Sequence, residues 1–60
     1  MKVVIVDDEP VARRTLREYC AAAGDLEVTG EYGDSVAALR AVRLDPPHLL
    51  FLDIQMDALT

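Results

Sequence analysis

The segment MKVVIVDDEP, residues 1–10, contains the pattern that decides the fold. Its apolar residues 3–6 run directly into three acids, Asp7, Asp8 and Glu9. A short, continuous run of β-branched residues is typical of a strand covered on both faces, as in a parallel sheet. Neighbouring carboxylates repel one another, increasingly so as water is excluded. The acids therefore either surround a positive charge or are hydrated at the end of the strand.

A helix is expected immediately after the acids. Pro10 fits its first turn, with Asp8 or Glu9 as the cap, and Gly24 fits its end. The side chains expected on its apolar face are Ala12, Leu16, Tyr19, Cys20 and Ala23. Those expected largely off that face are Arg13, Arg14, Arg17 and Glu18.

Two further strands and a second helix are expected in the rest of the chain. Residues 26–32 (LEVTGEY) alternate like a half-exposed strand near a sheet edge. The side chains expected on one side of it are Leu26, Val28, Gly30 and Tyr32. A helix capped by Asp34 or Ser35 follows and ends at Asp-Pro-Pro, residues 45–47. Its expected apolar face comprises Val36, Leu39, Val42 and Leu44. Residues 49–52 form a second continuous apolar strand.

This β-α-β-α-β order predicts an α/β fold with a parallel sheet. If the first and third strands are neighbours, right-handed crossovers place the two helices on opposite faces of a sheet with strand order 2-1-3. Open parallel sheets form their sites at the carboxyl ends of the strands, where the direction of the connections reverses. We therefore expect Asp7, Asp8 and Asp53 to meet at that point.

The composition is that of one small globular unit, with 60 residues of which 52% are apolar. Eleven acids against six bases give a net charge of −5, which disfavours contact of this segment with nucleic acid or an anionic membrane. The lone Cys20 cannot form an internal disulfide, and we expect it in the core. The apolar runs are far shorter than the roughly 20 residues that cross a bilayer, so we expect a cytoplasmic protein.

Gathered carboxylates form a hard oxygen site that suits Mg²⁺ or Mn²⁺. An Asp beside such a metal is also a potential nucleophile toward phosphorus, which would give an acyl phosphate. The metal neutralises charge on the phosphoryl group, a large part of what phosphoryl transfer requires. The acids thus favour phosphoryl chemistry.

VVIVDDEPVARRTLREY, followed by LLFLDIQM, resembles the receiver domain of two-component response regulators over essentially the whole chain. The resemblance implies a truncated flavodoxin-like fold, with residues 1–60 as about the first half of a receiver. The later strands and helices, a switch Ser/Thr and a phosphate-binding Lys would lie beyond Thr60. Receivers commonly have Pro after the residue equivalent to Met56, where this chain has Asp57.

The resemblance also implies roles for particular residues. Asp53 would be the phosphoacceptor, phosphorylated by a histidine kinase. Asp8 would bind Mg²⁺ directly together with Asp53, Asp7 would support the metal largely through water, and the backbone carbonyl of Gln55 would be a further ligand. The similarity is greatest to the branch of response regulators whose output domain is a LytTR DNA-binding module, and it lies in the stretches VDDEPVARRTL and FLDIQM.

Two other functions compete with a phosphoacceptor. A metal-dependent phosphatase of the haloacid dehalogenase type also uses a strand-end Asp, but it needs a second Asp where this chain has Gln55. The other alternative is a dimerisation or interaction module without phosphotransfer. We expect the chain to form a homodimer or higher oligomer, either by pairing the edges of its third strand or by exchanging a strand or helix between copies, because a half receiver leaves apolar surface open. His48 is expected on the surface, away from the acids.

Overall fold

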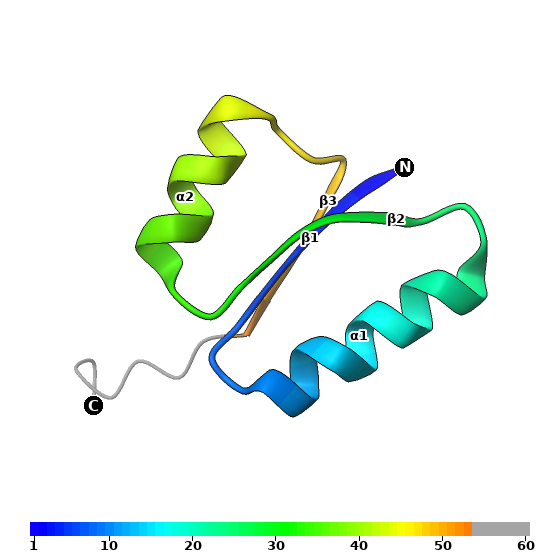
Figure 1. Cartoon of the computed structure of the whole chain (residues 1–60). Helices are drawn as coiled ribbons and strands as arrows, with labels where there is room; N and C mark the ends of the chain where they lie inside the picture. Colours follow the sequence, from blue (N-terminus) through cyan, green and yellow to red (C-terminus); the bar gives the residue numbers. More distant parts are fainter. Residues whose placement is uncertain (54–60) are drawn as a thin grey trace.

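The computed structural model describes residues 1–53. The elements in chain order are β1 (Lys2–Asp7), α1 (Pro10–Ala23), β2 (Glu27–Tyr32), α2 (Ser35–Leu44) and β3 (Leu49–Asp53). All strand pairs are parallel, in the order β2-β1-β3, and the two helices lie on opposite faces of the sheet (Figure 1). The predicted β-α-β-α-β fold and strand order 2-1-3 are confirmed.

The core is organised around β1, the central strand, whose residues from Val3 to Asp7 are all buried. Val3 and Ile5 face α1 and pack with Cys20 of that helix. The alternate residues Val4 and Val6 face α2 and pack with its Ala38. The continuous apolar run of residues 3–6 is therefore explained by burial on both faces of the sheet. We call these two sides of the sheet the α1 face and the α2 face.

An extra residue in β2 changes which side chains share a face. Val3 pairs with Val28, but Val4 pairs with Gly30, so that Thr29 is unmatched in the register. Such a bulge reverses the alternation of every residue that follows it. Val28 consequently packs on the α1 face and Tyr32 on the α2 face. The prediction that residues 26–32 alternate without interruption was wrong for this reason.

The helix boundaries follow from local chemistry. Pro10 occupies the first turn of α1, and Gly24 ends the helix with φ of 85°, a conformation that favours glycine. The side chain of Asp34 caps α2 by accepting a hydrogen bond from the N–H of Ala37 at 3.2 Å, as predicted. By contrast, the cap residue of α1, Glu9, makes no side-chain capping hydrogen bond.

The apolar faces of the helices were predicted only in part. In α1, Cys20 is buried and Leu16 packs beside it, whereas Tyr19 is 67% exposed. In α2, the side chains that meet the sheet are Ala38 and Val42. The predicted side chains that are instead exposed are Val36, Leu39 and Leu44. The helix therefore meets the sheet through Ala38 and Val42, while its other large apolar side chains stay exposed.

His48 joins β1 and β3 at the amino end of the sheet. Its Nδ1 accepts a hydrogen bond from the N–H of Lys2 at 2.9 Å, and its own N–H donates to the carbonyl of Lys2 at 2.9 Å. This side chain is exposed, as predicted, but it also has a structural role. Among the helices of residues 1–53, none has the length and apolar character needed to cross a membrane.

Candidate functional site

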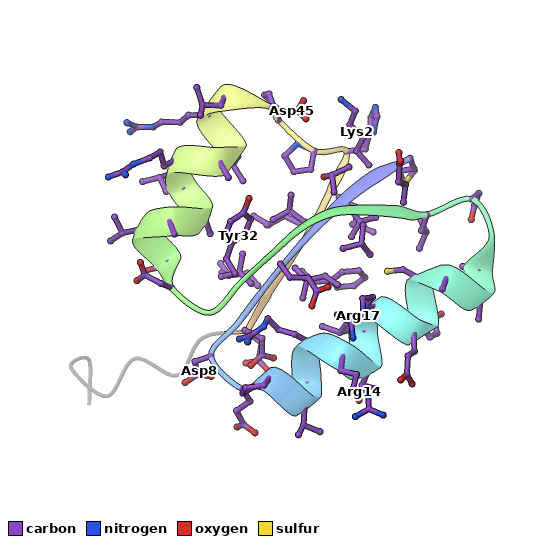
Figure 2. The ribbon with its side chains drawn as sticks, viewed as in Figure 1. Lys2, Asp8, Arg14, Arg17, Tyr32 and Asp45 are labelled. Atoms are coloured by element: carbon purple, nitrogen blue, oxygen red, sulfur yellow. The ribbon has the colours of Figure 1, made fainter. Side chains whose placement is uncertain are left out.

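The carboxyl ends of β1 and β3 bring two acids from distant parts of the sequence together. Asp7 and Asp53 are register partners on the neighbouring strands, and their side chains project on the same face because paired residues of parallel strands do so. Asp8 directly follows β1. Figure 2 shows it at the opposite end of the sheet from Lys2 and Asp45. Asp7 and Asp53 are therefore neighbours at this end of the sheet, and the convergence of all three carboxylates on one metal site stays a prediction.

The three acids differ in burial. Asp7 is only 3% exposed, and its Oδ1 accepts a hydrogen bond from the N–H of Glu9 at 2.9 Å. Asp8 and Asp53 are exposed. The buried acid thus shapes the turn from β1 into α1, while the other two carboxylates are accessible to a ligand.

Arg13 brings a positive charge to this end of the sheet. It lies one turn into α1 and is half-buried, and its Nη1 donates a hydrogen bond to the carbonyl oxygen of Asp7. The same nitrogen lies so close to Gly33, at the end of β2, that a Cβ added there would be 2.8 Å from it. The guanidinium therefore lies between the turn after β1 and the turn after β2.

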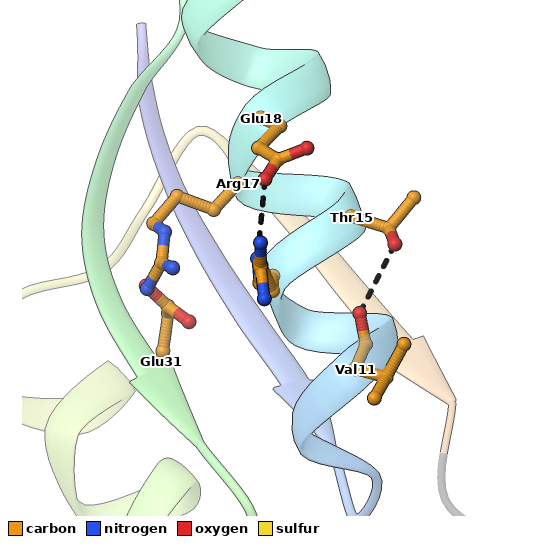
Figure 3. A network of polar contacts seen from close by, with 6 residues as sticks. Val11, Thr15, Arg17, Glu18 and Glu31 are labelled. Atoms are coloured by element: carbon orange, nitrogen blue, oxygen red, sulfur yellow. Dashed lines mark hydrogen bonds and ion pairs between the residues drawn. The ribbon is translucent and has the colours of Figure 1, made fainter.

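The other arginines of α1 have different surroundings. Arg14 forms an exposed ion pair with Glu18 at 3.3 Å, and Arg17 pairs with Glu31 of β2 at 2.9 Å (Figure 3). An exposed pair such as Arg14–Glu18 contributes about 0–1 kcal/mol to stability. Arg13 is thus distinguished from Arg14 and Arg17 by contacts with the backbone at the strand ends.

The donor chemistry at this edge suits a hard cation. Within residues 1–53, no three side chains of His, Cys, Asp or Glu are grouped in a way that would hold a metal ion. Mg²⁺ does not require such a group, because it is bound through one or two carboxylates and keeps several waters. The accessible oxygens of Asp8 and Asp53 fit that mode of binding. The predicted carbonyl ligand, Gln55, lies outside the described residues.

The fold and the site define a class of protein, a parallel α/β domain with accessible carboxylates where its strand connections reverse direction. Residues 3–60 match the family model described as the response regulator receiver domain. The chain belongs to this family.

Curated relatives agree with this assignment. The chain is 48% identical over 56 residues to the transcriptional regulatory protein BtsR of Escherichia coli K12, a match that covers 93% of the chain and 23% of the relative. The uncharacterized transcriptional regulatory protein YhcZ of Bacillus subtilis is 41% identical over 56 residues, covering 93% of the chain and 26% of the relative. The chain thus spans about a quarter of the length of these relatives. No solved structure gives a significant match.

Arg13 is the site residue that sequence reasoning missed. It was placed off the apolar face of α1, together with the exposed arginines. The spacing contained a signal, because Arg13 lies three residues before Leu16 and seven before Cys20, and such spacings fall on one side of a helix. That side faces the sheet, and the first turn of α1 is next to the acids.

Proposed function

We propose that this chain is the phosphoacceptor part of a two-component response regulator, phosphorylated on Asp53 by a histidine kinase. The single observation that supports this most directly is the pairing of Asp53 with Asp7 at the carboxyl end of the sheet, next to Asp8. This arrangement leaves Asp53 exposed, as a residue that must meet a large protein donor has to be.

The proposed step is a transfer between two side chains. A carboxylate oxygen of Asp53 attacks the phosphorus of the phosphohistidine in the kinase. The new oxygen–phosphorus bond forms as the phosphorus–nitrogen bond breaks, and the nitrogen keeps the electron pair of that bond. A carboxylate nucleophile carries no proton that must be removed during the attack, so the transfer needs no general base. The products are an aspartyl phosphate and a free histidine.

Mg²⁺ is the proposed cofactor, bound by Asp8 and Asp53, with Asp7 acting largely through water and the Gln55 carbonyl as a further ligand. When bound, it would offset negative charge on the phosphoryl oxygens. The chain's own contribution is to hold the exposed carboxylates in place. Asp7 does so through its hydrogen bond to the N–H of Glu9, which orders the turn that carries Asp8.

The proposed output of the whole protein is transcriptional control through a LytTR-type DNA-binding module. This rests on the sequence of residues 1–60 and on relatives such as BtsR, whose names describe them as transcriptional regulatory proteins. The segment itself is acidic and is not proposed to contact DNA.

Phosphorylation of a complete receiver that contains this segment would test the assignment. With acetyl phosphate or a phosphorylated kinase, we expect the wild type to form an acid-stable, base-labile phosphoprotein in the presence of Mg²⁺. Asp53→Asn should abolish it, because an amide cannot replace the carboxylate nucleophile. The measurement is intact-protein mass spectrometry.

Two controls match this variant. Asp45→Asn removes an exposed carboxylate at the opposite end of the sheet, and His48→Ala removes the histidine of the described chain. Both should be phosphorylated to nearly the wild-type extent. Undiminished phosphorylation of Asp53→Asn would contradict the proposed acceptor.

A second candidate function is self-association without phosphotransfer, and a groove on the α2 face favours it. The groove has a volume of about 320 Å³. It is lined by Val6, Ser35, Val36, Ala38, Leu39, Val42, Leu50 and Leu52.

Within residues 1–53, β3 pairs only with β1, so its other edge offers backbone groups to a second copy. We propose a two-fold dimer that pairs these edges in antiparallel orientation. Sedimentation of the 60-residue chain at micromolar concentration should show a dimer, and a folded monomer would refute it.

A further inference from the structure

Four acidic residues lie at one end of the sheet: Asp7, Asp8, Glu9 and Asp53. The positively charged group beside them is the guanidinium of Arg13. We infer that Arg13 is a positioning residue for the metal and phosphoacceptor site, and that Gly33 provides the space in which its guanidinium lies. This inference rests on the proposed function, because it concerns the same carboxylates.

The first step of the argument is the hydrogen bond from Arg13 to the carbonyl of Asp7. That carbonyl belongs to the peptide linking Asp7 to Asp8, so its orientation determines the direction in which the backbone leaves β1. A hydrogen bond from a charged donor is roughly twice as strong as a neutral one. Together with the bond between the N–H of Glu9 and Asp7 Oδ1, it holds the turn that presents Asp8 from two sides.

The second step is the contact between Arg13 and Gly33. A Cβ on Gly33 would lie 2.8 Å from Arg13 Nη1, which is too close, and 3.7 Å from the carbonyl oxygen of Asp7, which is an ordinary contact. The φ angle of Gly33 is not positive, so its backbone conformation does not require glycine. Glycine at this position is explained instead by the Arg13 guanidinium, which occupies the space that a side chain at position 33 would need. Arg13 therefore connects α1, the end of β1 and the end of β2, where the site is formed.

Groups that orient the ligands of a metal typically change its affinity about 10-fold to 100-fold when they are removed. Three variants separate this effect from a simple effect of charge. Arg13→Gln removes the charge, Arg13→Lys keeps the charge but loses the planar donors, and Gly33→Ala keeps Arg13 but fills its space. The last change displaces only the flexible end of a side chain, so the fold should tolerate it.

Positioning predicts that all three variants weaken Mg²⁺ binding, by about tenfold for Arg13→Gln and less for the other two. A purely electrostatic role predicts the opposite for Arg13→Gln, because removing a positive charge favours a cation, and predicts wild-type binding by Gly33→Ala. Arg14→Gln is the matched control and should bind Mg²⁺ as the wild type does. Binding is measured by calorimetry on the whole protein, after circular dichroism has confirmed that each variant is folded.

Hydrogen exchange of the Asp8 and Glu9 amides tests the inference without metal. We expect faster exchange in Arg13→Gln and Gly33→Ala than in the wild type and Arg14→Gln, with unchanged exchange in the interior of β1. If the wild type binds no Mg²⁺, the proposed metal site fails, and the exchange rates still decide whether Arg13 holds the turn. Unchanged exchange in both variants, or tighter Mg²⁺ binding by Arg13→Gln, would overturn the inference.

Discussion

The two faces of the sheet differ in how far they cover the third strand. On the α1 face, Leu49 and Phe51 of β3 pack against the buried side chains of Val3, Ile5 and Cys20. On the α2 face, Leu50 and Leu52 are 43% and 64% exposed. Both faces of β3 are equally apolar in sequence, so the difference comes from the placement of the helices.

The comparison shows that one face is a core and the other is in part a surface. The long side chains Leu16 and Leu26 border the α1 face. On the α2 face, Ala38 of α2 packs against Val4 and Val6 of β1, and Leu39 is exposed where it lines the groove. Substitutions on the α1 face should therefore affect folding, whereas those in the groove should affect association.

The largest effect is expected for Ile5→Ala on the α1 face. Ile5 is fully buried, and truncating such a side chain costs about 3 kcal/mol through lost burial and the cavity that remains. Urea unfolding followed by circular dichroism measures the change. Leu52→Ala is the control: at protein concentrations low enough to keep the chain monomeric, it should stay within about 0.5 kcal/mol of the wild type, because that side chain is 64% exposed.

Ile5→Val keeps the test measurable if the alanine variant does not fold, with an expected loss of about 1 kcal/mol. If Leu52→Ala were as destabilising as Ile5→Ala, the two faces would contribute equally and the comparison would be wrong.

An intermediate effect is expected for Leu50→Glu in the groove. A charge there should weaken self-association at least tenfold, about 1.4 kcal/mol, because carboxylates from both copies would be brought together and partly dehydrated. Sedimentation velocity over a range of concentrations measures it. Tyr19→Glu introduces the same charge at an exposed aromatic residue of α1 and should leave association unchanged. Equal weakening by both variants would indicate an effect of net charge alone.

The smallest changes in stability are expected for substitutions at the cap residues that precede the two helices, and they differ between α1 and α2. Asp34→Ala removes the side chain that caps α2 and should destabilise the protein by about 1 kcal/mol. Glu9→Ala should cost less, because Glu9 makes no capping hydrogen bond through its side chain. Thermal unfolding of both variants tests this, and a larger loss for Glu9→Ala would show that the start of α1 depends on that acid.

The sequence predicted the order of elements, the parallel sheet and the caps, since these follow from local patterns such as the run of residues 3–6 and the turn at Asp34. It could not predict which side of α2 meets the sheet. Val36 and Leu39 are as apolar as Val42, and only the approach of Ala38 to β1 distinguishes them. The pairing of Asp7 with Asp53 followed from the topology, whereas the contacts of Arg13 depend on side-chain packing.

The unmatched Thr29 has a consequence for the evolutionary record of this strand. Val28 packs with residues of α1 and Tyr32 packs with residues of α2, although an unbroken two-residue repeat would place both side chains on the same face of the sheet. Among homologous chains that keep the extra residue, a substitution at Val28 should be accompanied by substitutions in α1. A substitution at Tyr32 should be accompanied by substitutions in α2. In a homologue that lacks this residue, the following β2 residues would keep the same β1 partners and the same faces, so the strand would show an unbroken two-residue alternation while each packing partner stayed the same.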